Sequence, residues 1–115
     1  MRLLIVDDHR SFRDAARRVL ESAGFAVVGE AADGQSALVA VSELRPDIVL
    51  LDVQLPDIDG FEVASRLTGN GKAPAIVMTS SRDAADFGPL VAQSGARGFV
   101  HKADLSGAAI GALLE

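Results

Sequence analysis

The chain has 115 residues, of which 49% are hydrophobic, and its net charge is −5 at pH 7. This length accommodates one domain with a single buried core, so we expect residues 1–115 to form one domain, with no second domain in this chain. The acidic balance disfavours nucleic-acid binding by this domain, because a phosphate backbone needs a clustered basic face. The absence of cysteine excludes disulfides, thiolate metal sites and cysteine nucleophiles.

The sequence also lacks the marks of membrane insertion or export. No apolar run approaches the roughly 20 residues that a membrane-spanning helix needs. The N-terminal segment MRLLIVDDH becomes acidic too early for a secretory signal peptide. We therefore expect a soluble, cytoplasmic protein without a membrane partner.

Short apolar segments that are rich in branched residues predict five β-strands. They are residues 3–6, 25–28, 48–51, 75–78 and 98–100. Four of the five lack the alternation of a half-exposed strand, which is typical of a parallel sheet with helices on both faces.

Segments with helical spacing of apolar residues separate the predicted strands. The clearer ones lie within residues 12–23, 37–44 and 61–67, and weaker ones lie within 90–94 and 105–113. Turn-forming residues fall between the elements, with Asp33 as an expected helix N-cap. These breakers are Gly24, Asp33-Gly34, Pro46, Asp59-Gly60, Asn70-Gly71 and Gly95. The predicted fold class is α/β, a (βα)5 chain with a doubly wound five-stranded parallel sheet.

Four of the predicted strands end in polar residues, and the carboxyl ends of parallel strands share one edge of the sheet. These endings are Asp7-Asp8, Asp52, Thr79-Ser80 and His101-Lys102. A single carboxylate after a strand is more often a turn or cap residue than a ligand. Three carboxylates held together, however, repel one another strongly even at an effective dielectric of about 20. We therefore expect a bound cation.

Oxygen ligands in a pocket open to water favour Mg²⁺, or Mn²⁺, as that cation. Such a metal would offset the repulsion between an attacking carboxylate and an incoming phosphoryl group, and Lys102 would neutralise a further oxygen. Asp52 is then a candidate nucleophile. The hydroxyl of Ser80 or Thr79 is a candidate donor to the same phosphoryl group.

Four segments resemble the response-regulator receiver domain of two-component signalling, in particular the receivers of helix-turn-helix regulators of the LuxR/NarL type. They are LLIVDDH, DIVLLDVQLPDIDGFEV, VMTSS and GARGFVHK. The resemblance covers about residues 2–114, and the acidic pair, the LD-x-x-LP-x-x-DG stretch, the hydroxyl and the lysine are jointly specific in this order. It implies a flavodoxin-like sheet with the strand order 2-1-3-4-5.

By position, the resemblance assigns Asp52 as the phosphoacceptor. Asp8 and Asp52 would bind Mg²⁺ directly, whereas Asp7 would act through water. The backbone carbonyl of Gln54 would complete the metal shell, and Lys102 would contact the phosphoryl group.

The resemblance also assigns switch residues. Ser80 is expected to be the switch hydroxyl, with Thr79 as the alternative if the alignment shifts by one residue. Phe99 falls at the aromatic switch position, although burial in a strand explains it equally well. The family usually places a proline, often with a cis peptide bond, where this sequence has Ala103, so the loop after the fifth strand is expected to differ.

Other residues near the motifs are expected to be structural. His9 follows the acidic pair but has no partner histidine at ligand spacing, so we expect it to start a helix. Strand alternation should point His101 away from the pocket, and we assign it no chemistry. Pro56 and Gly60 are expected to shape the loop that leads into the third helix, with Gly60 supplying a permissive backbone.

The resemblance implies that a sensor histidine kinase transfers a phosphoryl group to Asp52. The domain would be a signalling protein rather than an enzyme, and would assist its own phosphorylation and dephosphorylation. The new charge would switch the surface of the fourth helix, fifth strand and fifth helix, and the resemblance allows a homodimer on phosphorylation. DNA would be a partner only of a C-terminal effector domain. Arg13, Arg17 and Arg18 are candidate exposed contacts of the kinase.

Three alternatives remain open to the sequence. A receiver-like interaction module that is not phosphorylated would commonly lack part of the set formed by Asp7, Asp8, Asp52 and Lys102. A phosphatase of the haloacid-dehalogenase type would carry an aspartate at the position of Gln54. A flavodoxin-like cofactor binder would need aromatic residues to stack on a flavin, whereas the chain has no Trp or Tyr.

Overall fold

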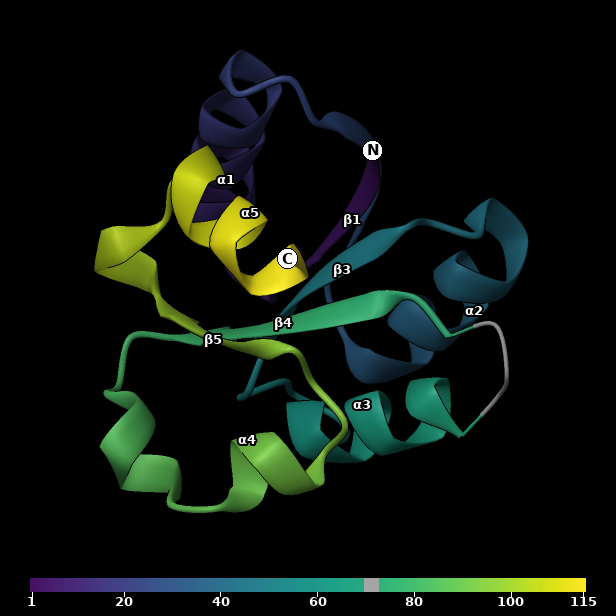
Figure 1. The fold of residues 1–115 in the computed structure, drawn as a ribbon. Helices are drawn as coiled ribbons and strands as arrows, with labels where there is room; N and C mark the ends of the chain where they lie inside the picture. Colours follow the sequence, from purple (N-terminus) through teal and green to yellow (C-terminus); the bar gives the residue numbers. More distant parts are fainter. Residues whose placement is uncertain (70–72) are drawn as a thin grey trace.

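The computed structural model describes residues 1–69 and 73–115, so the predicted Asn70-Gly71 turn lies outside the described residues. The strands are β1 (Arg2–Val6), β2 (Ala26–Ala31), β3 (Ile48–Asp52), β4 (Ala75–Ser80) and β5 (Gly98–His101). All neighbouring strands are parallel, and their order is β2-β1-β3-β4-β5 (Figure 1). The predicted flavodoxin-like, doubly wound sheet is confirmed.

Helices lie between the strands, as predicted. They are α1 (Arg10–Ser22), α2 (Gly34–Leu44), α3 (Gly60–Thr68), α4 (Leu90–Gln93) and α5 (Gly107–Leu114). The short 3-10 turns η1 (Ala84–Phe87) and η2 (Lys102–Asp104) precede α4 and α5. Asp33 caps α2 as predicted, because its side chain accepts a hydrogen bond from the backbone N–H of Ser36.

The segment between β4 and β5 contains little regular helix. Gly88 has a φ of 56°, a left-handed value that ends η1, and Pro89 has no N–H with which to continue it. The helix that follows, α4, has only 4 residues. Across the described parts of the chain, no helix combines the length and the apolar character that crossing a membrane would require.

Apolar layers cover both faces of the sheet. Ile48 and Leu50 of β3 belong to the layer beneath α1 and α5, whereas Val49 and Leu51 belong to the layer beneath α2, α3 and α4. All four side chains are fully buried. Figure 1 shows α1 and α5 on one face of the sheet, with α3 and α4 on the other. This arrangement explains why the strands lack alternation.

All strands except β1 extend further at their carboxyl ends than the apolar pattern predicts. β2 continues to Ala31 because its backbone still pairs with the last residue of β1. Asp52 pairs with Thr79, and Ser80 pairs with His101. Backbone pairing, which does not require apolar side chains, therefore fixes these polar residues along one edge of the sheet.

Candidate functional site

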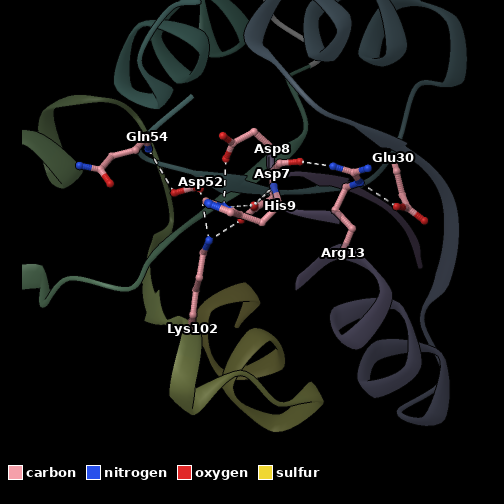
Figure 2. A network of polar contacts seen from close by, with 8 residues as sticks. All are labelled: Asp7, Asp8, His9, Arg13, Glu30, Asp52, Gln54 and Lys102. Atoms are coloured by element: carbon pink, nitrogen blue, oxygen red, sulfur yellow. Dashed lines mark hydrogen bonds and ion pairs between the residues drawn. The ribbon is translucent and has the colours of Figure 1, made fainter. Parts of the chain in front are cut away.

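The site lies at the carboxyl edge of the sheet, where β1 and β3 are neighbours. The chain leaves these two strands in opposite directions, since β1 is followed by β2 on one side and β3 by β4 on the other. Such a reversal opens a crevice beyond the strand ends. Asp7 and Asp8 follow β1, Asp52 ends β3 and Lys102 follows β5. Figure 2 shows their side chains converging.

Three carboxylates and one ammonium group meet in this crevice. Lys102 Nζ lies 2.6 Å from Asp7 Oδ2 and 3.3 Å from Asp52 Oδ2. Ligand atoms of Asp7, Asp8, His9 and Asp52 all lie within 4.8 Å of one another. Asp7 and Asp52 are 0% and 3% exposed, whereas Asp8 is open to solvent. The structure brings together the acids and the lysine that the sequence singled out.

Burial disfavours the charged form of Asp52. Loss of hydration is the largest influence, and with the negative charge of Asp7 it raises the pKa of Asp52 from 3.8 to about 6. The backbone N–H of Gln54 and the ammonium of Lys102 oppose this rise without cancelling it. A buried carboxylate with this pKa is poorly stabilised by the protein alone.

The neighbouring acids keep Lys102 charged. Burial by itself would lower the pKa of this ammonium group, but its contact with Asp7 and the charges of Asp52 and Asp7 outweigh burial, so the pKa is raised. Lys102 Nζ also lies 4.5 Å from the centroid of the Phe12 ring in α1, a cation–π distance that further restrains it. This aromatic contact was not predicted.

The crevice suits a hard divalent cation. Most of its donors are carboxylate oxygens, joined by the Nδ1 of His9, and three carboxylates face a single ammonium group. Asp7 Oδ2 is close to Lys102, yet within residues 1–69 and 73–115 this buried oxygen accepts no hydrogen bond of good geometry. An oxygen-preferring cation such as Mg²⁺ would balance the excess charge. Asp7, Asp8 and Asp52 are the candidate ligands that the structure brings together. The Gln54 carbonyl ligand stays a prediction.

The loop after β3 is anchored by hydrogen bonds at both ends. The backbone N–H of Gln54 donates to Asp52 Oδ1 at 3.1 Å. The carboxylate of Asp57 accepts bonds of 2.7 Å and 2.9 Å from the first two backbone N–H groups of α2. These bonds hold the pKa of Asp57 below its ordinary value. The loop that carries the predicted carbonyl ligand is therefore tied to a neighbouring helix.

Gly60 shapes the same region for a reason that differs from the predicted one. A Cβ atom at this position would collide with the backbone at Asp52 and Val53. The Gly60 N–H donates to the Val53 carbonyl at 2.7 Å. Its φ is not among the positive values that favour glycine, so close approach of two backbones, rather than a permissive conformation, requires it. Pro56 lies exposed in this loop.

Both hydroxyl candidates are buried at the end of β4. Ser80 Oγ accepts a hydrogen bond of 3.0 Å from the backbone N–H of Arg82. Thr79 Oγ1 finds no hydrogen-bond partner in the described parts of the chain. Ser80 is thus already coupled to the loop after β4, whereas Thr79 is not. The choice of Ser80 as the switch hydroxyl stays a prediction.

Phe99 belongs to a row of aromatic rings. Its centroid lies 5.9 Å from that of Phe87 in η1, which in turn lies 5.7 Å from that of Phe61 in α3. The row connects β5 to the segment after β4 and to α3. Phe99 is half-buried, a position that suits either a repacking side chain or a structural one, so its switch role also stays a prediction.

Arg13 supports the acidic pair, a role that was not predicted. Its Nη1 donates to the Asp7 carbonyl at 2.7 Å and its Nε donates to Glu30 at 3.0 Å (Figure 2). Arg17 contacts the other Glu30 oxygen at 2.9 Å. Burial opposes ionisation of Glu30, but the two arginines outweigh it and lower its pKa. The expectation that Arg13 and Arg17 are exposed is wrong, since the side chain of Arg13 is 16% exposed and Arg17 is half-buried, whereas Arg18 is exposed as predicted.

The two histidines occupy different parts of the site. His9 is the N-cap residue of α1, which confirms the predicted helix start. Its Nδ1 also lies 3.1 Å from an oxygen of Asp7 and 3.1 Å from one of Asp8, contacts that were not predicted. His101 points toward the loop after β4, where its ring bonds the backbone of Ser81.

Comparison with known proteins agrees with this geometry. Residues 3–108 match the family model for the response regulator receiver domain. The chain belongs to this family. Receiver domains are parts of two-component systems, and response regulators are signalling proteins that are generally not enzymes.

Relatives of this receiver domain include DNA-binding regulators. The DNA-binding response regulator MtrA of Mycolicibacterium smegmatis is 42% identical over 103 residues, which cover 88% of this chain and 43% of MtrA. The chain spans less than half the length of the curated relatives that it matches first.

Solved structures support the LuxR/NarL-type resemblance. The NarL signal receiver domain from Mycobacterium tuberculosis superposes with a TM-score of 0.87 at 31% identity, covering 98% of this chain and 95% of that one. A LuxR-family two-component response regulator from Aurantimonas sp. SI85-9A1 gives a TM-score of 0.87 at 33% identity, covering 98% and 84%.

Proposed function

We propose that this receiver domain accepts a phosphoryl group on Asp52 with the help of Mg²⁺, and that the donor is a sensor histidine kinase. The observation that carries the proposal is the position of Lys102, whose ammonium contacts both Asp7 and Asp52 beside the exposed carboxylate of Asp8. Kinases are the typical partners of this family, and receiver domains in general bind Mg²⁺. One crevice thus supplies a nucleophile, metal ligands and a cation for the phosphoryl group.

The transfer needs few groups from the protein. A carboxylate oxygen of Asp52 attacks the phosphorus of the donor phosphohistidine; the O–P bond forms as the N–P bond breaks, and the imidazole nitrogen leaves with the bonding pair and takes up a proton. Lys102 neutralises one phosphoryl oxygen. Mg²⁺, when bound, supplies the remaining charge neutralisation. Hydrolysis ends the active state: a water oxygen attacks phosphorus, the bond from phosphorus to the Asp52 oxygen breaks, Asp52 leaves as a carboxylate, and the inorganic phosphate keeps the water protons. Lys102 would neutralise phosphoryl charge in this step too, so the domain would assist both steps.

The new charge would then act on the loop after β4. Ser80 Oγ accepts a hydrogen bond from the backbone N–H of Arg82. Donation of the Ser80 hydroxyl proton to a phosphoryl oxygen would draw this loop toward Asp52, and Phe99 would repack in response. A pre-existing equilibrium at the surface of α4, β5 and α5 would shift, which would allow a homodimer to form there.

The wider setting follows from the family. We propose that residues 1–115 act as one receiver domain and that DNA binding belongs to an effector domain of the kind that DNA-binding relatives such as MtrA imply. The cytoplasmic location expected from the sequence stays a prediction.

Intact mass spectrometry after incubation with acetyl phosphate and Mg²⁺ tests the proposal. The wild type is expected to gain one phosphoryl group, and Asp52→Asn none. Asp47→Asn is the matched control, because Asp47 precedes β3 and lies at the opposite end of the same strand; this variant should still be modified. Borohydride reduction followed by peptide fragmentation should place the acyl phosphate at Asp52.

Two outcomes would refute the proposal. One is the absence of any adduct under conditions in which a control receiver reacts, which would favour the unphosphorylated interaction module instead. The other is an adduct that persists in Asp52→Asn.

Asp8→Asn is expected to raise the Mg²⁺ concentration needed for half-maximal modification, because it removes a proposed direct ligand.

A further inference from the structure

His101 joins the two loops that carry the phosphoryl-binding groups. Its Nε2 lies 2.9 Å from the carbonyl oxygen of Ser81, and its Nδ1 lies 3.0 Å from the backbone nitrogen of Ala103. The Ser81 carbonyl can only accept and the Ala103 N–H can only donate. Both bonds are therefore made by a neutral ring that carries its proton on Nε2.

The two backbone partners lie next to the reacting groups. Ser81 directly follows Ser80, the predicted switch hydroxyl, and Ala103 directly follows Lys102. Ser80 and His101 are the last paired residues of β4 and β5. The bond from the His101 ring to the Ser81 carbonyl therefore connects the two segments one residue beyond the last backbone pair. A single side chain thus ties the hydroxyl and the ammonium group to each other.

The backbones of these two loops have weaker restraints than the side chain of Lys102. Residues 81–86, which follow β4, are all exposed. The turn that contains Lys102 is 3 residues long, and its closing bond from Leu105 N to the Lys102 carbonyl is 3.5 Å, a long distance for a hydrogen bond. Loss of the His101 ring would remove the side-chain bridge between the backbones of the two loops, although Lys102 would keep its contacts with Asp7 and Asp52.

Ala103 is what permits the arrangement. A proline at this position has no N–H and would leave His101 Nδ1 without its donor. Ala103, which replaces the usual proline, and His101 therefore act together, because the hydrogen bond from the Ala103 N–H to the His101 ring restrains the turn.

We propose that His101 is a positioning residue for the reaction at Asp52, which holds the Ser80 hydroxyl and the Lys102 ammonium at the separation that phosphoryl transfer needs. This inference rests on the proposed function. His101 touches neither Asp7, Asp8 nor Asp52 in the described structure, so it acts through the two loops rather than through the metal ligands.

The test compares His101→Ala, which loses both bonds, with His101→Asn. The shorter asparagine can still accept from the Ala103 N–H through its side-chain oxygen, but it cannot reach Ser81. Asp83→Ala is the matched control, because Asp83 approaches the same ring only at 4.0 Å and is 85% exposed. Each variant is phosphorylated by acetyl phosphate over a range of Mg²⁺ concentrations, and amide hydrogen exchange of Ala103 and Arg82 is followed by NMR.

We expect the maximal phosphorylation rate of His101→Ala to fall about tenfold, as the loss of one or two net hydrogen bonds implies. The half-saturating Mg²⁺ concentration should not change, whereas a merely structural defect would weaken Mg²⁺ binding as well. His101→Asn should recover Ala103 amide protection and part of the rate, and Asp83→Ala should match the wild type.

The outcomes separate this inference from the proposed function. Suppose that the wild type is phosphorylated on Asp52 and that His101→Ala and His101→Asn react as fast as the wild type. This result would overturn the role of His101 and leave the proposed function intact. A wild type that is never phosphorylated overturns both. If His101→Ala does not fold, His101→Asn carries the test, because its rate must still fall below that of the wild type.

Discussion

Replacing Asp52 by asparagine is expected to stabilise the metal-free domain at neutral pH. Burial and the charge of Asp7 raise the pKa of Asp52 to about 6, against 3.8 for an ordinary aspartate. This gap corresponds to about 3 kcal/mol of destabilisation when the carboxylate is charged. The raised pKa already includes the favourable contact with Lys102. Asparagine removes the charge, so we expect a net gain of about 2 to 3 kcal/mol.

The sign of the pH dependence follows from the raised pKa. Below the ordinary pKa of 3.8 the Asp52 carboxyl is protonated in both the folded and the unfolded chain, and its contribution to the free energy of unfolding is fully present. As pH rises through about 6, the folded domain must accept a buried carboxylate, and that stability is lost. The advantage of Asp52→Asn should therefore be large at about pH 8 and small at about pH 4.5.

Urea unfolding measured by circular dichroism in EDTA checks this expectation, since the chain has no Trp or Tyr for fluorescence. Asp47→Asn serves as the control for loss of one negative charge. Adding Mg²⁺ should stabilise the wild type by mass action and narrow the difference. A variant that is less stable than the wild type at about pH 8 in EDTA, or a gain that persists unchanged at about pH 4.5, would refute the reasoning.

Three further predictions concern the scaffold of the site, each measured by urea unfolding. Gly60→Ala should destabilise the domain by about 3 kcal/mol, because its Cβ would collide with the Asp52 backbone, and it should also slow acetyl phosphate modification; wild-type behaviour would contradict the close-approach argument. Leu50→Ala should cost about 3 kcal/mol through a cavity at a fully buried site, without changing Mg²⁺ affinity. Glu30→Gln should cost about 1 kcal/mol near neutral pH; since the pKa of Glu30 is lowered in the fold, the difference should vanish as pH falls through that lowered value.

Local pattern was enough to predict the architecture. Alternation of apolar strands with helical spacing predicted a (βα)5 sheet, because burial on both faces leaves its signature in each short segment. The acids at the ends of β1 and β3 could be grouped without coordinates, since parallel strands end at a common edge. The pattern ended four of the five strands too early, because backbone pairing continues, for example through Asp52 and Ser80, regardless of side-chain polarity.

Contacts between distant segments could not be predicted in this way. The bond from Arg13 to the Asp7 carbonyl depends on how α1 lies across β1 and β2, and a basic residue on a helix gives no sign that it is partly buried. The pKa of Asp52 depends on the burial and charges that meet only in the folded crevice. His101 was assigned no chemistry because alternation turns it from the pocket, yet that direction is what places its ring between two loops.

The sequence by itself determined the sheet, its functional edge and the identity of the acids and lysine there, because these depend on residue type and on periodicity along the chain. Tertiary structure decided which groups are charged, which backbone atoms hold them and how the loops are tied together, because burial, Coulomb interaction and hydrogen bonding depend on distances between residues far apart in the chain.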